Sequence, residues 1–176
     1  MWALDEARFG LKVWFRRRWC PLGARPPWVY DDQYEWLWLY AAVEPTTGHS
    51  FCLFLPWLDG PCFEVFLREW RQAFPHDRFA VVLDNSGAHT SRQVAWPDGI
   101  EPVPLPAYSP ELNPGERLFK ELRERLANHT FGSPEALEHE LTEALRHYWE
   151  QPSALAQLTA YPWWREGVQY ITTSPE

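Results

Sequence analysis

Three acidic residues spread along this chain have the types and positions that suit divalent-metal chemistry. Asp5 follows a short apolar stretch, Asp84 follows the β-branched run 79–83, and Glu116 lies in the first turn of an expected helix. Ligands of open α/β sheets gather where strands end. Three carboxylates converging there would repel one another unless a cation neutralised them, and Mg²⁺ and Mn²⁺ prefer oxygen ligands. Two such ions about 4 Å apart can clamp the attacking and leaving oxygens of a phosphoryl transfer.

Each acid also has a plainer interpretation. Asp5 lies near a terminus, where acids are commonly solvated. Asp84 could cap the turn that follows it, and Glu116 could be a capping-box acid facing the helix dipole. Taken singly, none of the three residues decides the matter.

The residues around these acids form longer motifs. Positions 83–89 read Leu-Asp-Asn-Ser-Gly-Ala-His, and positions 106–116 read Pro-Ala-Tyr-Ser-Pro-Glu-Leu-Asn-Pro-Gly-Glu. Together they resemble the mariner-type DDE transposases and, within them, the bacterial insertion-sequence-630 group. The early Asp5-Glu6 followed by Phe9-Gly10 is similar to the first acid block of that family. The resemblance covers roughly residues 3–130.

This resemblance implies an RNase H-like α/β fold, with a five-stranded mixed sheet of order 3-2-1-4-5 and helices on both faces. It implies that Asp5, Asp84 and Glu116 are the catalytic acids and hold two Mg²⁺ or Mn²⁺ ions. The implied reaction nicks transposon ends by hydrolysis and joins the freed 3′-hydroxyls to target DNA. Self-association on DNA is also implied, in the bacterial cytoplasm and at the nucleoid when DNA is bound.

The chain departs from the family pattern at three positions near the last acid. Phe119 stands where relatives usually carry Trp, Arg123 where they often carry Lys, and Gly115 where a β-branched residue is common. None of these changes removes an acid, so the implied metal site is intact.

Two residues after the second acid are further candidates. His89 could touch the scissile phosphate or tune a metal-bound water, or it could be a helix-start residue packed against the sheet. Asn85 could orient Asp84 or bind phosphate.

A basic set follows the third acid. Arg117, Lys120 and Arg123 lie at spacings of three, which predicts one helix face beside Glu116 that could contact DNA phosphates. The alternative is a solvated face whose basic residues pair with neighbouring glutamates.

The elements that must position these residues follow a mixed α/β pattern. We expect a strand ending at Asp5, a half-exposed strand over 11–19, and a hairpin of strands 35–44 and 50–55. Further on we expect a helix over 61–74, a buried strand over 79–83, an edge strand over 100–105, and helices over 113–128 and 133–149. Asn113 is the expected N-cap of the first of these last two helices. Residues 152–176 remain unassigned.

Composition is consistent with one globular domain. The chain has 176 residues, of which 45% are hydrophobic, and we expect a catalytic domain over 1–150 with a tail over 151–176 packed on it. The three cysteines form no C-x-x-C motif, which favours reduced thiols. No signal peptide or membrane span is expected, since the apolar runs are short.

The net charge of −8 conflicts with DNA binding, which favours Lys and Arg. Relatives carry an N-terminal helix-turn-helix region that reads the transposon ends, and only four residues precede Asp5. The expectation is therefore that this region is absent here. The chain would be either the second reading frame of a split gene, which a frameshift could fuse to an upstream-frame DNA-binding polypeptide, or a truncated copy.

Two other functions stay open. The chain could be a non-catalytic remnant that binds and inhibits full-length transposase. It could also be a different RNase H-like nuclease that cuts RNA in hybrids, although the motif at 106–116 disfavours this.

Overall fold

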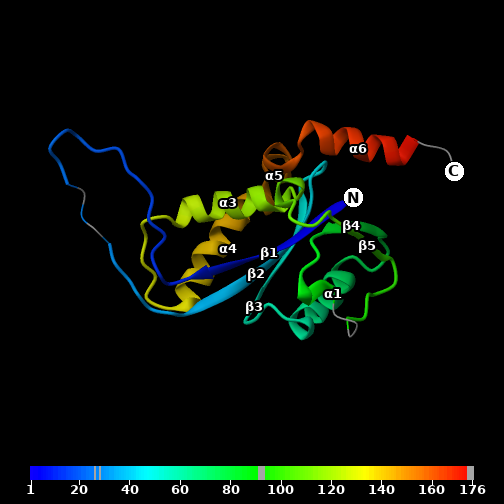
Figure 1. Cartoon of the computed structure of the whole chain (residues 1–176), viewed down its shortest axis with the longest axis horizontal. Coiled ribbons are helices and arrows are strands. Elements are labelled where there is room, and N and C mark those ends of the chain that lie inside the picture. Colours follow the sequence, from blue (N-terminus) through cyan, green and yellow to red (C-terminus); the bar gives the residue numbers. More distant parts are fainter. Residues whose placement is uncertain (26, 28, 91–93, 174–176) are drawn as a thin grey trace.

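The computed structural model describes residues 1–25, 27, 29–90 and 94–173, and these residues build a five-stranded mixed sheet (Figure 1). Its strands are β1 (Trp2–Gly10), β2 (Trp36–Glu44), β3 (His49–Leu55), β4 (Phe79–Leu83) and β5 (Ile100–Pro104). Their order is β3-β2-β1-β4-β5, with β1 antiparallel to β2 and parallel to β4. The predicted order is confirmed.

Helices cover both faces of this sheet, because strand alternation gives each face its own apolar layer. On one face, Ala3 and Ala7 pack with α3 (Gly115–Leu126), α4 (Pro134–Glu150) and α5 (Pro152–Thr159). On the other face, Trp2 and Leu4 pack with α1 (Gly60–Ala73). We call these layers the α3-side core and the α1-side core.

Local signals explain where the long helices begin. The Asp59 side chain caps α1 by accepting from Cys62 N, and Ser133 caps α4 by accepting from Ala136 N. A proline follows each cap, where its missing N–H costs nothing. The predictions of these helices, and of β4 and the edge strand β5, are confirmed.

The prediction for the first 35 residues was wrong in two ways. The first strand does not end at Asp5 but continues to Gly10, and no strand covers 11–19. Leu11 and Val13 are buried, which produced the alternating pattern, yet each makes only an isolated backbone bond to the returning chain. The other described residues of this β1–β2 loop extend away from the sheet (Figure 1).

The start of α3 also differs from the prediction. Residues Pro110–Leu112 form a short 3-10 helix, η1, and α3 begins at Gly115 with Pro114 at its cap position. Asn113 is therefore not the N-cap of α3. It ends η1, and Pro114 takes the cap position of the following helix. The Asn113 Oδ1 still accepts from Gly115 N at 3.0 Å.

The C-terminal segment contributes to the main core. Leu155 of α5 and Trp164 of α6 (Pro162–Thr173) are buried in the α3-side core. Residues 174–176 of the expected tail lie outside the described residues. The three cysteines are free thiols. Within the described ranges, no helix has the length and apolar character needed to cross a bilayer.

Candidate active site

Asp5 and Asp84 lie level with each other because of the register between two parallel strands. The last pair between β1 and β4 is Ala3 with Val82, and each acid comes two residues further along its strand. β4 ends at Leu83, so Asp84 leaves the sheet beside the middle of β1. Asp5 thus reaches the pocket at the carboxyl end of the shorter neighbouring strand β4 rather than at the end of its own strand.

A close approach of α3 brings Glu116 to the same place. A Cβ on Gly115 would lie 3.5 Å from the Asp5 Cβ, in ordinary contact, and 3.2 Å from Asn113 Oδ1, so the start of α3 packs closely on β1. Asn113 is buried and its Nδ2 donates to Leu4 O at 3.0 Å. This bond fixes the start of α3 against β1, one residue before Asp5.

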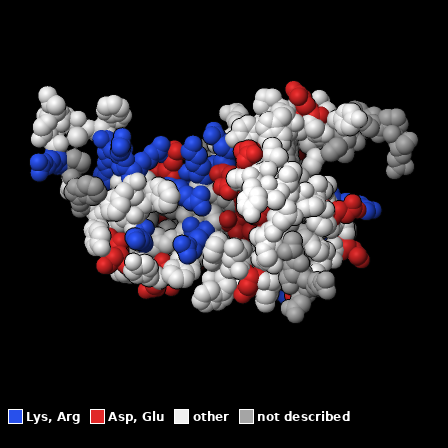
Figure 2. All heavy atoms as spheres, viewed as in Figure 1, with Lys and Arg blue, Asp and Glu red and all other residues white. Residues whose placement is uncertain are grey.

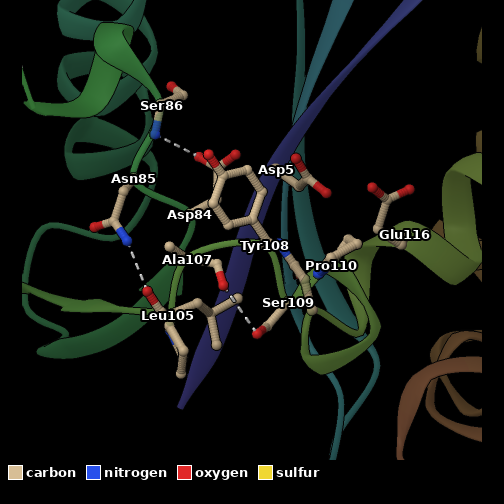
Figure 3. A pocket seen from close by; sticks show the side chains of 12 residues that line it. Asp5, Asp84, Asn85, Ser86, Leu105, Ala107, Tyr108, Ser109, Pro110 and Glu116 are labelled. Carbon is tan, nitrogen blue, oxygen red and sulfur yellow. Dashed lines mark hydrogen bonds between the residues drawn. The ribbon is translucent and has the colours of Figure 1, made fainter.

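The three acids line one pocket of about 420 Å³ (Figure 3). Asp5 lies between the other two in this view, with its carboxylate turned toward Glu116. The remaining walls come from the segments after β4 and β5: Asn85, Ser86, Leu105, Pro106, Ala107, Tyr108, Ser109, Pro110 and Asn113.

Burial, together with neighbouring negative charge, perturbs the pKa of Asp5. Burial, followed by the charges of Glu116, Glu6 and Asp84, raises the pKa of Asp5 to about 8, against the lowering effect of a hydrogen bond from Glu6 N. A site that holds acids at this cost is typical of function.

The donor chemistry fits a hard divalent cation, since all three acids offer only oxygen. In the part of the chain that the structure describes, however, no three His, Cys, Asp or Glu side chains lie close enough to hold a metal ion as they stand. The acids are gathered around one pocket but do not meet at a single point. Cation binding there requires rotation of their side chains.

Asp84 is held on one side. Its Oδ1 accepts from Ser86 N at 2.9 Å and lies 2.9 Å from His89 Nδ1, and neither contact uses Oδ2. Asn85, predicted to orient this acid or bind phosphate, lines the pocket, and its Nδ2 donates to Leu105 O at 2.7 Å.

His89 lies in the short helix α2 (Gly87–Thr90) and is buried behind the acids. Its Nε2 is 2.8 Å from Glu6 Oε1, and its Nδ1 is engaged by Asp84. Burial lowers the pKa of His89, but the hydrogen bond and charge of Glu6, with Asp84, outweigh burial and raise it. The ring therefore faces two carboxylates and not the open pocket, which agrees with the alternative of a buried residue at a helix start rather than with a contact to the scissile phosphate.

The basic set on α3 lies beside the pocket and not in it. Arg117 and Lys120 are exposed, and Arg123 packs its guanidinium 5.7 Å from the Phe9 ring centre. Among the described residues, no ion pair joins these three to a carboxylate, and Glu124 pairs with Arg16 at 2.8 Å. Figure 2 shows Lys and Arg gathered where α3 lies, next to acidic side chains.

Two residues of this region were missed by sequence reasoning. Glu6 was noted only as part of a motif, because the strand was expected to end at Asp5. A strand extended to Gly10 would have shown an acid on its buried α1-side face. Tyr108 lines the pocket fully exposed, with a backbone φ of 59°, which no sequence pattern signalled.

The family comparison matches residues 1–138 to the DDE superfamily endonucleases. An uncharacterised protein of Sinorhizobium fredii, y4pE/y4sA, is 34% identical over 98 residues, which are 54% of this chain and 73% of that protein.

Solved structures of the Mos1 transposase share the fold. A pre-cleavage Mos1 transpososome matches with a TM-score of 0.64 and 18% identity over 99% of this chain, and a Mos1 paired end complex with Mg matches with 0.63 and 20% over 99%. The chain spans about half of those chains, 56% in both cases. The sheet and its helices are thus those of the RNase H-like cores of transposases.

Proposed function

Since this chain belongs to the DDE superfamily endonucleases, we propose that it is a transposase catalytic domain that cleaves DNA strands by hydrolysis and transfers the 3′-hydroxyl ends into target DNA. The observation that carries the proposal is that Asp5, Asp84 and Glu116, which come from three separate elements, line one pocket.

In this proposal, Asp5, Asp84 and Glu116 hold two Mg²⁺ or Mn²⁺ ions. The ions would supply activation of the attacking water or 3′-hydroxyl and stabilisation of the departing oxygen. The Mos1 complexes with Mg and with Mn support this choice of metal.

The chain's own residues supply position and charge. β1 provides a rigid platform for Asp5, while Asp84 and Glu116 approach from a strand end and a helix start. A bound cation would lower the raised pKa of the Asp5 carboxyl, because a positive charge favours its ionised form. Tyr108 and Asn85 border the space that a DNA strand would enter.

DNA is the proposed substrate and partner, as transposon end and as target, which the Mos1 paired-end complex with its left transposon end supports. Self-association on DNA is proposed with it. Asn85, Arg117, Lys120 and Arg123 are the proposed phosphate contacts.

The test is nicking of supercoiled plasmid DNA by the purified chain with Mg²⁺ or Mn²⁺. We expect Asp84→Asn to reduce the rate by at least roughly a hundredfold, because it removes a metal ligand. Glu111→Gln is the matched control, since Glu111 is an exposed acid of η1 outside the pocket lining. Nicking that survives Asp84→Asn would rule out the assigned site.

A further inference from the structure

Glu6 is a buried carboxylate that the proposed reaction does not use. Strand alternation points it to the α1-side of the sheet, opposite to Asp5, and its side chain is 4% exposed. A carboxylate in such a place is costly unless a specific partner compensates it. The cost indicates that this acid has a role beyond packing.

The partner of Glu6 is His89, which reaches back to the site. The imidazole Nε2 lies 2.8 Å from Glu6 Oε1, and its Nδ1 faces Asp84, 2.9 Å from Oδ1 and 3.2 Å from the backbone carbonyl oxygen. The His89 side chain is 2% exposed. The Phe63 ring of α1 packs on it with the ring centres 4.6 Å apart. Glu6 on β1, His89 on α2 and Asp84 after β4 therefore form one continuous chain of contacts.

Asp84 needs such a support. It follows the end of β4, and its side chain is 58% exposed, so its carboxylate would otherwise sample several rotamers. Asp5 sits within the ladder of β1, and Glu116 sits on a helix fixed by Asn113. Asp84 is the acid of the three whose backbone lies outside any strand or helix.

We propose that Glu6 and His89 are positioning residues: Glu6 anchors the His89 ring, and the ring holds Oδ1 of Asp84 so that the other oxygen is presented to the cation site. This inference rests on the proposed function, because it takes Asp84 to be a cation ligand. Hydrogen-bonded supports of a ligating carboxylate contribute about 10–100-fold to metal affinity.

The experiment measures Mn²⁺ affinity of the full chain without DNA, from the electron paramagnetic resonance signal of free Mn²⁺, together with the melting temperature in chelator. We expect Glu6→Leu to weaken Mn²⁺ binding about tenfold. Glu6→Gln keeps an acceptor oxygen for His89 and is expected to stay within about threefold of the native affinity. His89→Leu combined with Glu6→Leu should weaken binding no more than His89→Leu alone, because both residues act through one contact.

A purely structural role gives a different pattern. Glu6→Leu leaves Nε2 of the buried His89 without its partner, so the melting temperature is expected to fall, as it should in any variant that unpairs a buried polar group. The matched control is Glu44→Leu, which removes another buried acid at the far end of β2 and should lower the melting temperature while leaving Mn²⁺ affinity unchanged. Equal loss of affinity in Glu6→Leu and Glu44→Leu, or none in Glu6→Leu, overturns the inference.

Asp84→Asn separates this inference from the proposed function. If Asp84→Asn weakens Mn²⁺ binding and Glu6→Leu does not, the positioning role alone is lost. If Asp84→Asn leaves the affinity unchanged, the metal site itself fails, and the positioning role fails with it.

Discussion

The Glu44 carboxylate is buried at the end of β2, where it accepts hydrogen bonds from the backbone and side chains of Thr46 and Thr47. Burial raises its pKa, but these bonds outweigh burial and hold the pKa below its ordinary value. A carboxyl whose folded pKa is depressed stabilises the fold above its unfolded pKa, and that contribution is lost as pH falls through the folded pKa.

We therefore expect Glu44→Gln to lower the free energy of unfolding by on the order of 1–2 kcal/mol at pH 7, and by less at pH 3. Urea denaturation at both pH values measures this difference. Glu101→Gln is the control, because its exposed ion pair with Arg78 contributes little. A Glu44→Gln effect that is the same at both pH values would contradict the prediction.

Tyr108 at the pocket rim holds a left-handed backbone conformation, with φ at 59°, which costs an ordinary residue about 1 kcal/mol. Tyr108→Gly should remove this cost and raise the melting temperature by about 2–4 °C. Asn128 has nearly the same φ, 62°, but Asn tolerates it, and its Oδ1 accepts from Arg16 N. Asn128→Gly should therefore lower the melting temperature. Calorimetry of both variants measures the cost of the backbone conformation at Tyr108, and a lower melting temperature for Tyr108→Gly would contradict the prediction.

Among the helices and strands, the sequence predicted β4, β5, α1 and α4 because their signals are local. An apolar run or a cap followed by proline specifies each of them within a few residues. The sheet order came from the family resemblance and not from any local pattern, because strand neighbours depend on contacts between distant segments.

The site could be predicted as a set of residues but not as a geometry. The motifs identified Asp84 and Glu116. Whether Asp5 lies beside Asp84, however, depends on the register between β1 and β4, which the motifs do not give. The misread strand over 11–19 hid both the length of β1 and the buried face that Glu6 occupies. Leu11 and Val13 are buried by side-chain packing without a strand ladder, and periodicity alone does not separate these cases.

The contact between α5 and the β2–β3 turn yields a prediction about the C-terminal segment. Gly48 has φ of +79°, and a Cβ there would lie 1.7 Å from Pro152 O and 3.1 Å from Ala156 N. Gly48→Ala must therefore displace α5 as well as strain the turn, and we expect a loss of on the order of 2–4 kcal/mol in the free energy of unfolding.

Gly132→Ala is the matched control for this substitution, because a Cβ there would have no atom within 4 Å beyond its own chain neighbours. Its free energy of unfolding should stay within about 1 kcal/mol of the native value. Equal stability of the Gly48→Ala and Gly132→Ala variants in urea denaturation would show that α5 does not pack on the turn.

Across the molecule as a whole, the net charge of −8 is compatible with DNA binding only if basic side chains are segregated. The acids around Asp5 lie in and under the pocket, where cations would neutralise them, while Arg117 and Lys120 are exposed on α3 beside it. Figure 2 shows Lys and Arg gathered over α3 on this face, with acidic side chains beside them. The charge of the surface near the site, and not the net charge of the chain, then decides how strongly the chain binds a phosphate backbone.

This view predicts that the position of a removed positive charge matters more than the number removed. Arg117→Gln with Lys120→Gln should weaken binding to duplex DNA and reduce the salt dependence of log affinity by about 0.9 for each phosphate that these side chains neutralise. Arg78→Gln with Arg146→Gln makes the chain more negative by the same two charges, but these two arginines pair with Glu101 and Glu143 away from the pocket. Their double variant should bind DNA with nearly native affinity and slope, because the α3 face keeps all of its cations.

Fluorescence anisotropy with a labelled duplex between 50 and 200 mM salt, about the range in which such slopes are resolved, measures both variants. Equal slopes for the two double variants would mean that the α3 face does not meet DNA and that only total charge governs binding.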